Sequence, residues 1–233
     1  MDRQTRKNLK SDKFAEEVKH GFDFMSEHRA DIKRYGPIAL GLIVIAVAIF
    51  FYMRNQADVR EKVLADAIRV DNAHIGPAPP GFLTYPTQQE KDKARAKAFT
   101  DLASKYHGSQ EGAMGEFYLA SDAVDKGNLP EAEKRYKDVV DSAPTPYASL
   151  AKLALAKVYS AEGKDAEAEK LLRDLMASPT VTVSKEQATI QLAVVIGKKN
   201  PDAARKMLEP LRTERTAVSR AAVQAMGDVT GAH

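Results

Sequence analysis

The residues of this chain that could do chemistry are numerous, but their spacing builds no metal site. Five histidines, at residues 20, 28, 74, 107 and 233, form no cluster along the sequence. His20 and His28 are two helical turns apart, whereas a pair that chelates one metal from a helix is spaced i, i+4. Cysteine is absent, which excludes disulfides and thiolate sites. We expect no metal and no cofactor.

Catalytic motifs are equally absent from the sequence. The chain contains no G-x-x-x-x-G-K-[ST], G-x-G-x-x-G, H-E-x-x-H or G-x-S-x-G pattern. Pairs such as Glu131 with Arg135 and Glu167 with Lys170 have helical spacings, and each stabilises a solvated helix face by about 0.2–0.5 kcal/mol. An acid–base pair among them is the alternative, but catalysis needs groups that converge in a pocket. We predict no catalytic residue and no enzyme.

The composition limits the size of the fold and the kind of partner. With 233 residues, 44% of them hydrophobic and 29% charged, the chain can hold one or two modest domains. Its 35 basic and 32 acidic residues give a net charge of only +3 and are spread along the chain. Since no strongly basic surface follows from this balance, we expect no nucleic-acid partner.

An uncharged segment near the N-terminus predicts a transmembrane helix at residues 35–54. Residues 35–53, "YGPIALGLIVIAVAIFFYM", carry no charge, and a helix of this length spans about 30 Å of hydrocarbon. Pro37 is expected in its first turn, where a missing N–H costs nothing. A buried core helix and a cleaved signal peptide are the alternatives. An uncleaved anchor is favoured for two reasons. The basic region before the segment is 34 residues long, and the residues directly after it, "RNQADVRE", contain no small-x-small cleavage site.

The orientation of this helix rests on the basic residues around it. Within twenty residues of the span, four basic residues lie on each side, but the tail of residues 1–34 holds nine in all. A long C-terminal domain is translocated regardless of its charge. We therefore expect the N-terminus in the cytoplasm and the C-terminal domain outside.

Residues 1–34 form a charged cytoplasmic tail with one amphipathic stripe. Its apolar residues recur at helical spacing, so the tail is expected either to lie on the inner membrane surface or to dock on a partner. A solvated tail, interrupted at Gly21, is the alternative. The stripe consists of Phe14, Val18, Phe22, Met25 and Ile32.

Residues 55–89 are predicted to be a linker in two parts. The first part continues as an amphipathic helix. The second part, "IGPAPPGFLTYPTQQ", has four prolines and two glycines in fifteen residues and is predicted to be a loop.

Beyond the linker the sequence repeats itself. "KGNLPEAEKRYKDVV", residues 126–140, is followed thirty-six residues later by "EGKDAEAEKLLRDLM", and a further step reaches "KNPDAARKMLEPL". A period of 20–50 residues is the signature of a repeat architecture, in which each helical pair must stack on the next to bury its apolar face. The turns are expected at Gly127 and Gly163, with Asn128, Asp165, Asn200 and Ser184 as helix caps.

These columns resemble tetratricopeptide repeats over about residues 90–216. The columns that carry the likeness are Leu119, Ala120, Ala123, Ala132, Tyr136 and Pro144 in one repeat and Leu155, Ala156, Tyr159, Ala168 and Leu172 in the next. The period of 36 instead of 34 departs from the family. So does the third repeat, where Lys199 replaces the turn glycine.

The fold class is therefore predicted to be all-α: one N-terminal transmembrane helix followed by a solenoid of helical hairpins at residues 90–226. Residues 216–226 would form its capping helix. An upstream repeat is expected to join a helix around residues 60–70 to the stretch "KARAKAFTDLASKYHG".

The order of tail, span and repeats also resembles the bacterial single-span ancillary subunits of the SecYEG translocon. That likeness implies a bacterial inner-membrane protein whose repeat domain faces the periplasm. It implies a scaffold that contacts the translocon or periplasmic chaperones. The alternative is a structural or assembly subunit of an envelope complex, which acts as a homo-oligomer and binds no client.

A partner-binding groove is expected on the first helix of each pair. An apolar groove favours an amphipathic or unfolded segment, and a carboxylate clamp is disfavoured because only Lys157 is basic. The alternative is that Phe117 and Leu153 belong to the core. The expected groove residues are Met114, Phe117, Ser121, Leu150, Leu153, Lys157, Thr189 and Ala193.

Overall fold

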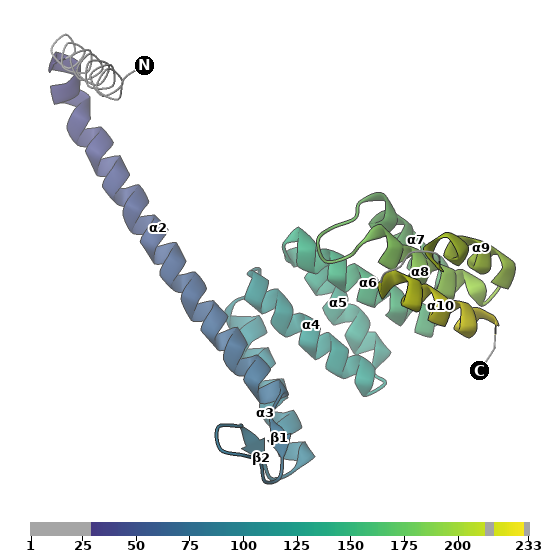
Figure 1. Ribbon diagram of the computed structural model, residues 1–233. Coiled ribbons are helices and arrows are strands. Elements are labelled where there is room, and N and C mark those ends of the chain that lie inside the picture. The colour runs from purple at the N-terminus through teal and green to yellow at the C-terminus, as the bar shows by residue number, and fades with distance from the viewer. Residues whose placement is uncertain (1–28, 213–216, 231–233) are drawn as a thin grey trace, which may run out of the picture. The chain divides into compact units, whose positions relative to one another are not determined.

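The computed structural model describes residues 29–212 and 217–230, so the predicted stripe at Phe14 to Met25 lies outside the described residues (Figure 1). The chain divides into two units, residues 1–58 and residues 59–233, each described by itself. The helices are α2 (Arg29–Asp71), α3 (Gln88–Lys105), α4 (Gln110–Asp125), α5 (Leu129–Ser142), α6 (Thr145–Ala161), α7 (Asp165–Ala177), α8 (Lys185–Gly197), α9 (Pro201–Arg212) and α10 (Ala217–Thr230). The all-α prediction is confirmed.

The first unit consists of the N-terminal part of α2. This is one helix, long and apolar enough to cross a membrane, and none of its apolar stretch is buried. Side chains such as Leu42 and Phe51 are more than 60% exposed, as a lipid-facing surface requires. The helix begins at Arg29, so Pro37 lies inside it and the expectation of a first-turn proline was wrong.

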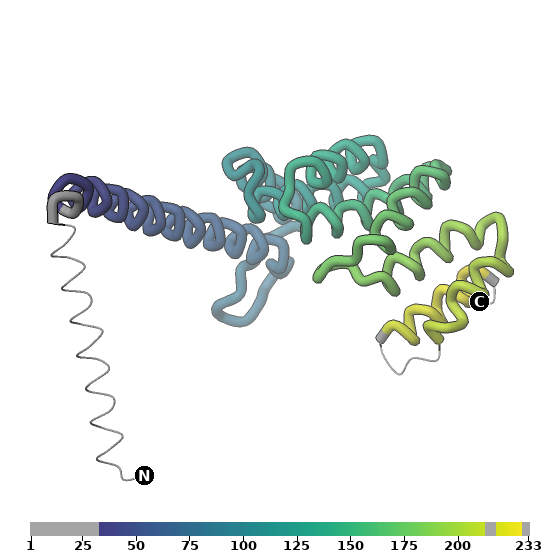
Figure 2. Tube along the Cα trace, turned by 90° about the horizontal axis from the view of Figure 1, so that it is seen from above, coloured from purple at the N-terminus to yellow at the C-terminus, as the bar shows by residue number. Residues whose placement is uncertain are grey.

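The second unit is a row of antiparallel helical pairs. Each helix from α3 to α10 packs against its neighbour in sequence, and α4, α6, α8 and α10 also contact one another in that order. Figure 2 shows these helices stacked side by side along the row. The helices that make the additional contacts are the first members of their pairs, together with the terminal helix. The solenoid prediction is confirmed.

The predicted repeat columns are the core of this row. Alanines 120, 132, 156 and 168 are at most 1% exposed, and their small side chains let neighbouring helices approach closely. Tyr136 and Leu172 fill the space beside them, at 4% and 0% exposed. Burial of such side chains contributes about 1.5–3 kcal/mol each, which explains why these columns repeat.

Glycine turns and helix caps separate the helices. Gly127 and Gly163 have φ of 73° and 76°, a conformation that residues with a Cβ rarely adopt. Asn128 accepts a hydrogen bond from the Glu131 N–H as an N-cap. Asp165 was wrongly predicted to be a cap, because α7 begins at this residue and its carboxylate pairs with lysines of the next repeat instead.

The third repeat forms its turn without a glycine. The described residues hold no non-glycine residue with positive φ, so the turn after α8 avoids the left-handed region. Lys199 occupies the position of the missing glycine and lies 2.9 Å from the Asp165 carboxylate. Asn200 accepts a hydrogen bond from the Ala203 N–H and caps α9. The lysine that replaces the turn glycine therefore forms an ion pair between two repeats.

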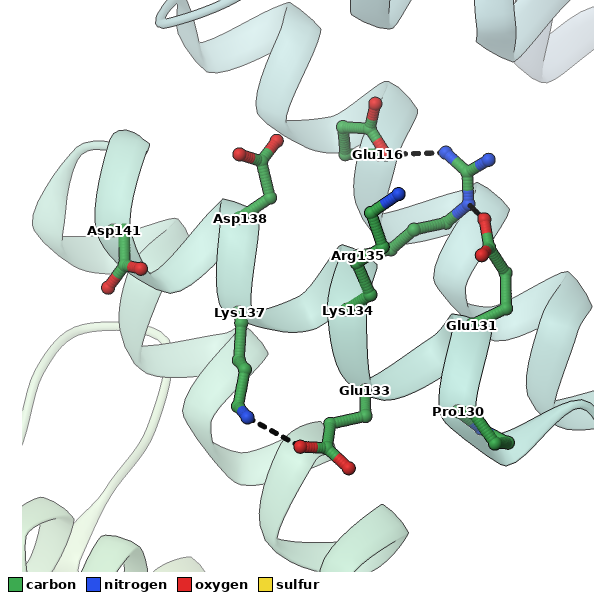
Figure 3. A pocket seen from close by; sticks show the side chains of 9 residues that line it. All are labelled: Glu116, Pro130, Glu131, Glu133, Lys134, Arg135, Lys137, Asp138 and Asp141. Carbon is green, nitrogen blue, oxygen red and sulfur yellow. Dashed lines mark hydrogen bonds and ion pairs between the residues drawn. The ribbon is translucent and has the colours of Figure 1, made fainter.

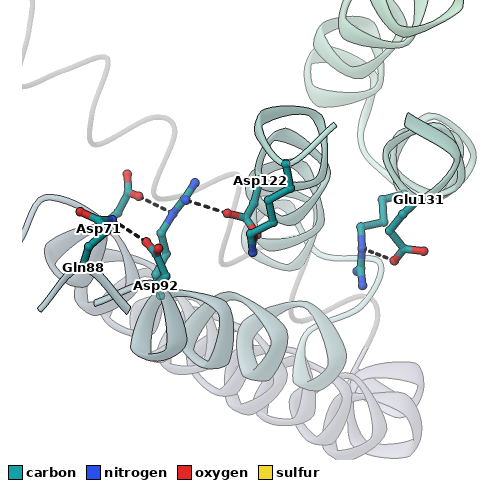
Figure 4. Close-up of polar contacts among 8 residues, drawn as sticks. Asp71, Gln88, Asp92, Asp122 and Glu131 are labelled. Carbon is teal, nitrogen blue, oxygen red and sulfur yellow. Dashed lines mark hydrogen bonds and ion pairs between the residues drawn. The ribbon is translucent and has the colours of Figure 1, made fainter. Parts of the chain in front are cut away.

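The last turns of α2 pair with α3 as the predicted upstream repeat. Ala67 is buried in one cluster with Phe99 and Leu102. Arg95 of α3 lies 2.6 Å from Asp71 of α2 and 3.0 Å from Asp122 of α4, so one guanidinium joins three helices (Figure 4). Between α2 and α3, His74–Ile75 (β1) and Thr84–Tyr85 (β2) form a short parallel pair that closes the proline-rich loop.

Candidate protein-binding groove

A solvent-open cavity of about 350 Å³ lies along α4 and α6. The lining residues of α6 recur at steps of three and four over eleven positions, so they form one stripe of the helix and span about 16 Å. We call this cavity the groove. Its lining is Phe117, Ser121, Val124, Leu129, Tyr136, Leu150, Leu153, Ala154, Lys157, Val158, Ala161 and Gln187.

The groove has a buried floor and a more exposed rim. Leu153 and Val158 are 5% and 3% exposed and belong to the central core cluster. Phe117 is half-buried and packs its ring edge-on against Tyr136, with ring centroids 5.3 Å apart. Val124 on the rim is 36% exposed. The floor side chains are therefore part of the hydrophobic core, whereas the rim side chains are accessible from solvent.

Few polar groups reach the groove. Burial raises the pKa of Tyr136, whose hydroxyl hydrogen-bonds with Ser121, and the nearby Asp125 carboxylate acts in the same direction. Lys157 is exposed and makes no hydrogen bond or ion pair with any residue that the structure describes. The groove thus offers an apolar surface with one unpaired cation.

A second, smaller cavity of about 270 Å³ continues the groove toward α8. It shares Lys157 and Ala161 with the groove, and its other apolar lining residues come from α6, α7 and α8. Its other cation, Lys198, donates to the Ser160 hydroxyl at 2.7 Å and lies 3.4 Å from the Asp165 carboxylate. Lys198 is therefore engaged within the chain, whereas Lys157 is not.

The structure brings five of the eight expected groove residues together: Phe117, Ser121, Leu150, Leu153 and Lys157 all line the groove. Met114 is half-buried and lines neither cavity. Thr189 donates its hydroxyl to the Lys185 carbonyl at 2.8 Å, and Ala193 is fully buried in a cluster with α9 and α10. The expected residues on α4 and α6 therefore lie mostly in the groove, whereas those expected on α8 do not.

Some lining residues were not anticipated from the sequence. Val124, Ala154 and Ala161 extend the stripes of α4 and α6 by helical steps of three or four, so the spacing of the expected residues could have found them. Gln187 comes from the first turn of α8, and no local spacing predicts its approach.

A larger cavity of about 750 Å³, which we call the outer cavity, is lined by residues of α5 and by Glu116 of α4 and has a different character. Figure 3 shows charged side chains, mostly of α5, around it. Arg135 lies 2.8 Å from Glu116 and 2.7 Å from Glu131. Hydrogen bonds from Lys137 and Lys164 lower the pKa of Glu133 to about 2. Ion pairs within the chain thus satisfy much of this charge.

Comparison with known proteins places this architecture in a family. Residues 32–178, more than half of the chain, match the tetratricopeptide repeat-like domain. The chain belongs to this family. The matched range begins before the apolar segment of α2 and ends after α7, so it contains the candidate span as well as the groove. No curated protein and no solved structure matches the chain significantly.

Proposed function

We propose that this protein is a membrane-anchored scaffold that binds other proteins in the groove along α4 and α6. One observation carries the proposal: two neighbouring helices line a solvent-open cavity with mainly apolar side chains, and no side chain that the structure describes fills it. A groove of this kind suits an amphipathic or extended segment of a partner, which buries its apolar side chains there. Repeat domains of this family bind proteins through such extended surfaces.

The anchor is the apolar helix at residues 35–54. Its apolar side chains, none of which is buried, and its place inside the family match support this role. The nine basic residues of the tail support a cytoplasmic N-terminus. With the anchor in a bacterial inner membrane, the repeat domain would then face the periplasm. There the scaffold would assist protein translocation or recruit periplasmic chaperones.

A crosslinking experiment tests the scaffold. A photoreactive amino acid replaces Ala154, which lines the groove, in the full-length chain within its own membranes. The expected result is an adduct with a different protein, identified by mass spectrometry. The same probe at Val181, an apolar residue 94% exposed and outside the groove, is the control and should give none. Adducts with a second copy alone would favour the assembly subunit instead.

A reporter fusion tests the orientation. Alkaline phosphatase becomes active only outside the cytoplasm. Because the proposal places the C-terminal domain there, a fusion after His233 should be active. A fusion that is expressed but inactive would place the repeat domain in the cytoplasm and contradict the proposal.

A further inference from the structure

The charged residues that line the groove and its continuation are all basic. Over the whole chain the charges nearly balance, at 35 basic and 32 acidic residues. Within the described residues, however, no aspartate or glutamate lines the groove or its continuation toward α8, and the two lining charges are both lysines. The outer cavity is the opposite case, since its lining mixes five acidic with three basic side chains.

Only one of the two lysines is available to a partner. Lys198 already interacts with Ser160 and Asp165. Lys157 has no partner among the residues that the structure describes, and it stands between apolar side chains on the α6 stripe, one turn from Ala154 and from Ala161. A cation that projects from an apolar surface attracts a carboxylate, and the apolar surroundings weaken the competition from water.

We propose that the groove selects apolar segments that carry an aspartate or glutamate side chain among their apolar residues, with that carboxylate paired to Lys157. The stripe from Leu150 to Ala161 is about 16 Å long, which matches about three turns of helix or five extended residues. This inference rests on the proposed function and specifies the chemistry of the partner that the groove accepts.

The probe is a set of three peptides of about twelve residues with blocked ends. Each has four leucines at helical spacing around one variable position, which is glutamate, glutamine or lysine, and its other residues are uncharged. Binding of the fluorescein-labelled peptides to the full-length chain in neutral detergent is followed by anisotropy. Exposed ion pairs contribute about 0.2–1 kcal/mol, so the glutamate peptide should bind about 1.4- to fivefold more tightly than the glutamine peptide, and the lysine peptide most weakly.

Two variants assign the preference to Lys157. Lys157→Glu should reverse the order, so that the lysine peptide binds best. Lys152→Glu makes the same charge change on α6 outside both cavities and should leave the order unchanged. The preference should also weaken at 1 M salt, where charges are screened within about 3 Å.

The outcomes separate this inference from the proposed function. If all three peptides bind equally and Lys157→Glu changes nothing, the groove binds apolar segments without regard to charge, and the carboxylate preference is wrong. If no peptide binds, both the peptide groove and its preference are contradicted. If the chain forms a dimer that competes with every peptide, the occupant is a second copy and the proposal is overturned.

Discussion

The groove and the outer cavity both involve α4 and α5, but they differ in how far their lining side chains interact within the chain. The outer cavity is larger, about 750 Å³ against about 350 Å³, yet its Arg135, Glu133 and Lys137 already take part in ion pairs within the chain. The groove is smaller; Val124 on its rim is 36% exposed, and Lys157 makes no hydrogen bond or ion pair with any described residue. Exposed apolar surface, more than volume, is therefore our reason to propose the groove as the binding site.

The largest expected effect separates the groove floor from its rim. Leu153→Ala removes a side chain that is 5% exposed and packed in the central cluster, so the free energy of unfolding should fall by about 2–5 kcal/mol. Chemical denaturation followed by circular dichroism measures this loss. Lys152→Ala, on the neighbouring residue, is the control and should change it by less than about 0.5 kcal/mol. Equal effects would mean that the floor is not part of the core.

Changes on the rim should affect binding more than folding. Val124→Ser with Leu150→Ser replaces partly exposed apolar side chains that line the groove, so the glutamate peptide should bind at least about tenfold more weakly. The unfolding free energy should fall by less than in Leu153→Ala. Val181→Ser is the control and should leave anisotropy titrations unchanged. Undiminished binding by the double variant would exclude the rim from the site.

The ion pairs of the outer cavity should contribute modestly to stability and nothing to binding. Arg135→Met keeps an apolar stem but leaves Glu116 and Glu131 without their shared cation. Because these side chains are partly exposed, the expected cost in unfolding free energy is about 0–1 kcal/mol. Peptide affinity should not change. Arg173→Met is the comparison and should cost less, because within the described part of the chain Arg173 forms a single, exposed ion pair, with Glu169. A loss of peptide binding in Arg135→Met would break the contrast between the two cavities.

The smallest effect is a pH dependence that arises from Glu133. Hydrogen bonds from Lys137 and Lys164 lower its pKa from 4.5 to about 2, so its contribution to stability is present above pH 4.5 and is lost as the pH falls toward 2. As the pH is lowered from 4.5 to 2, the denaturation midpoint of Glu133→Gln should therefore fall less steeply than that of the wild type. Glu209→Gln serves as the control; its carboxylate is half exposed and, among the described residues, pairs with Arg212. Parallel curves for Glu133→Gln and the wild type would show that this pair adds no stability.

The sequence predicted the repeat core because that core is periodic. Each core position depends on neighbours one helix away, and the same columns, such as Ala132 and Ala168, recur at a fixed spacing. The turn glycines followed from the same pattern, since Gly127 and Gly163 adopt the left-handed conformation that residues with a Cβ rarely adopt.

The groove was predicted only where the repeats continue regularly on both sides. Ala193 occupies a first helix like Leu153, but α10 packs against α8 and buries this residue in a cluster with Ala222 and Ala225. The terminal helix interrupts the repeat, so the period gives no information about what it covers. The role of Asp165 was missed for a similar reason, because Lys198 and Lys199 lie more than thirty residues away.

The central claim is that partners bind in the groove along α4 and α6. The most direct test crosslinks the glutamate peptide, with one leucine replaced by a photoreactive leucine analogue, to the full-length chain and maps the modified residues by mass spectrometry. The account predicts adducts on α4 and α6, at residues such as Val124, Leu150 and Ala154, and their loss when unlabelled peptide competes. Adducts concentrated on α5 around the outer cavity, or scattered over all helices, would contradict it.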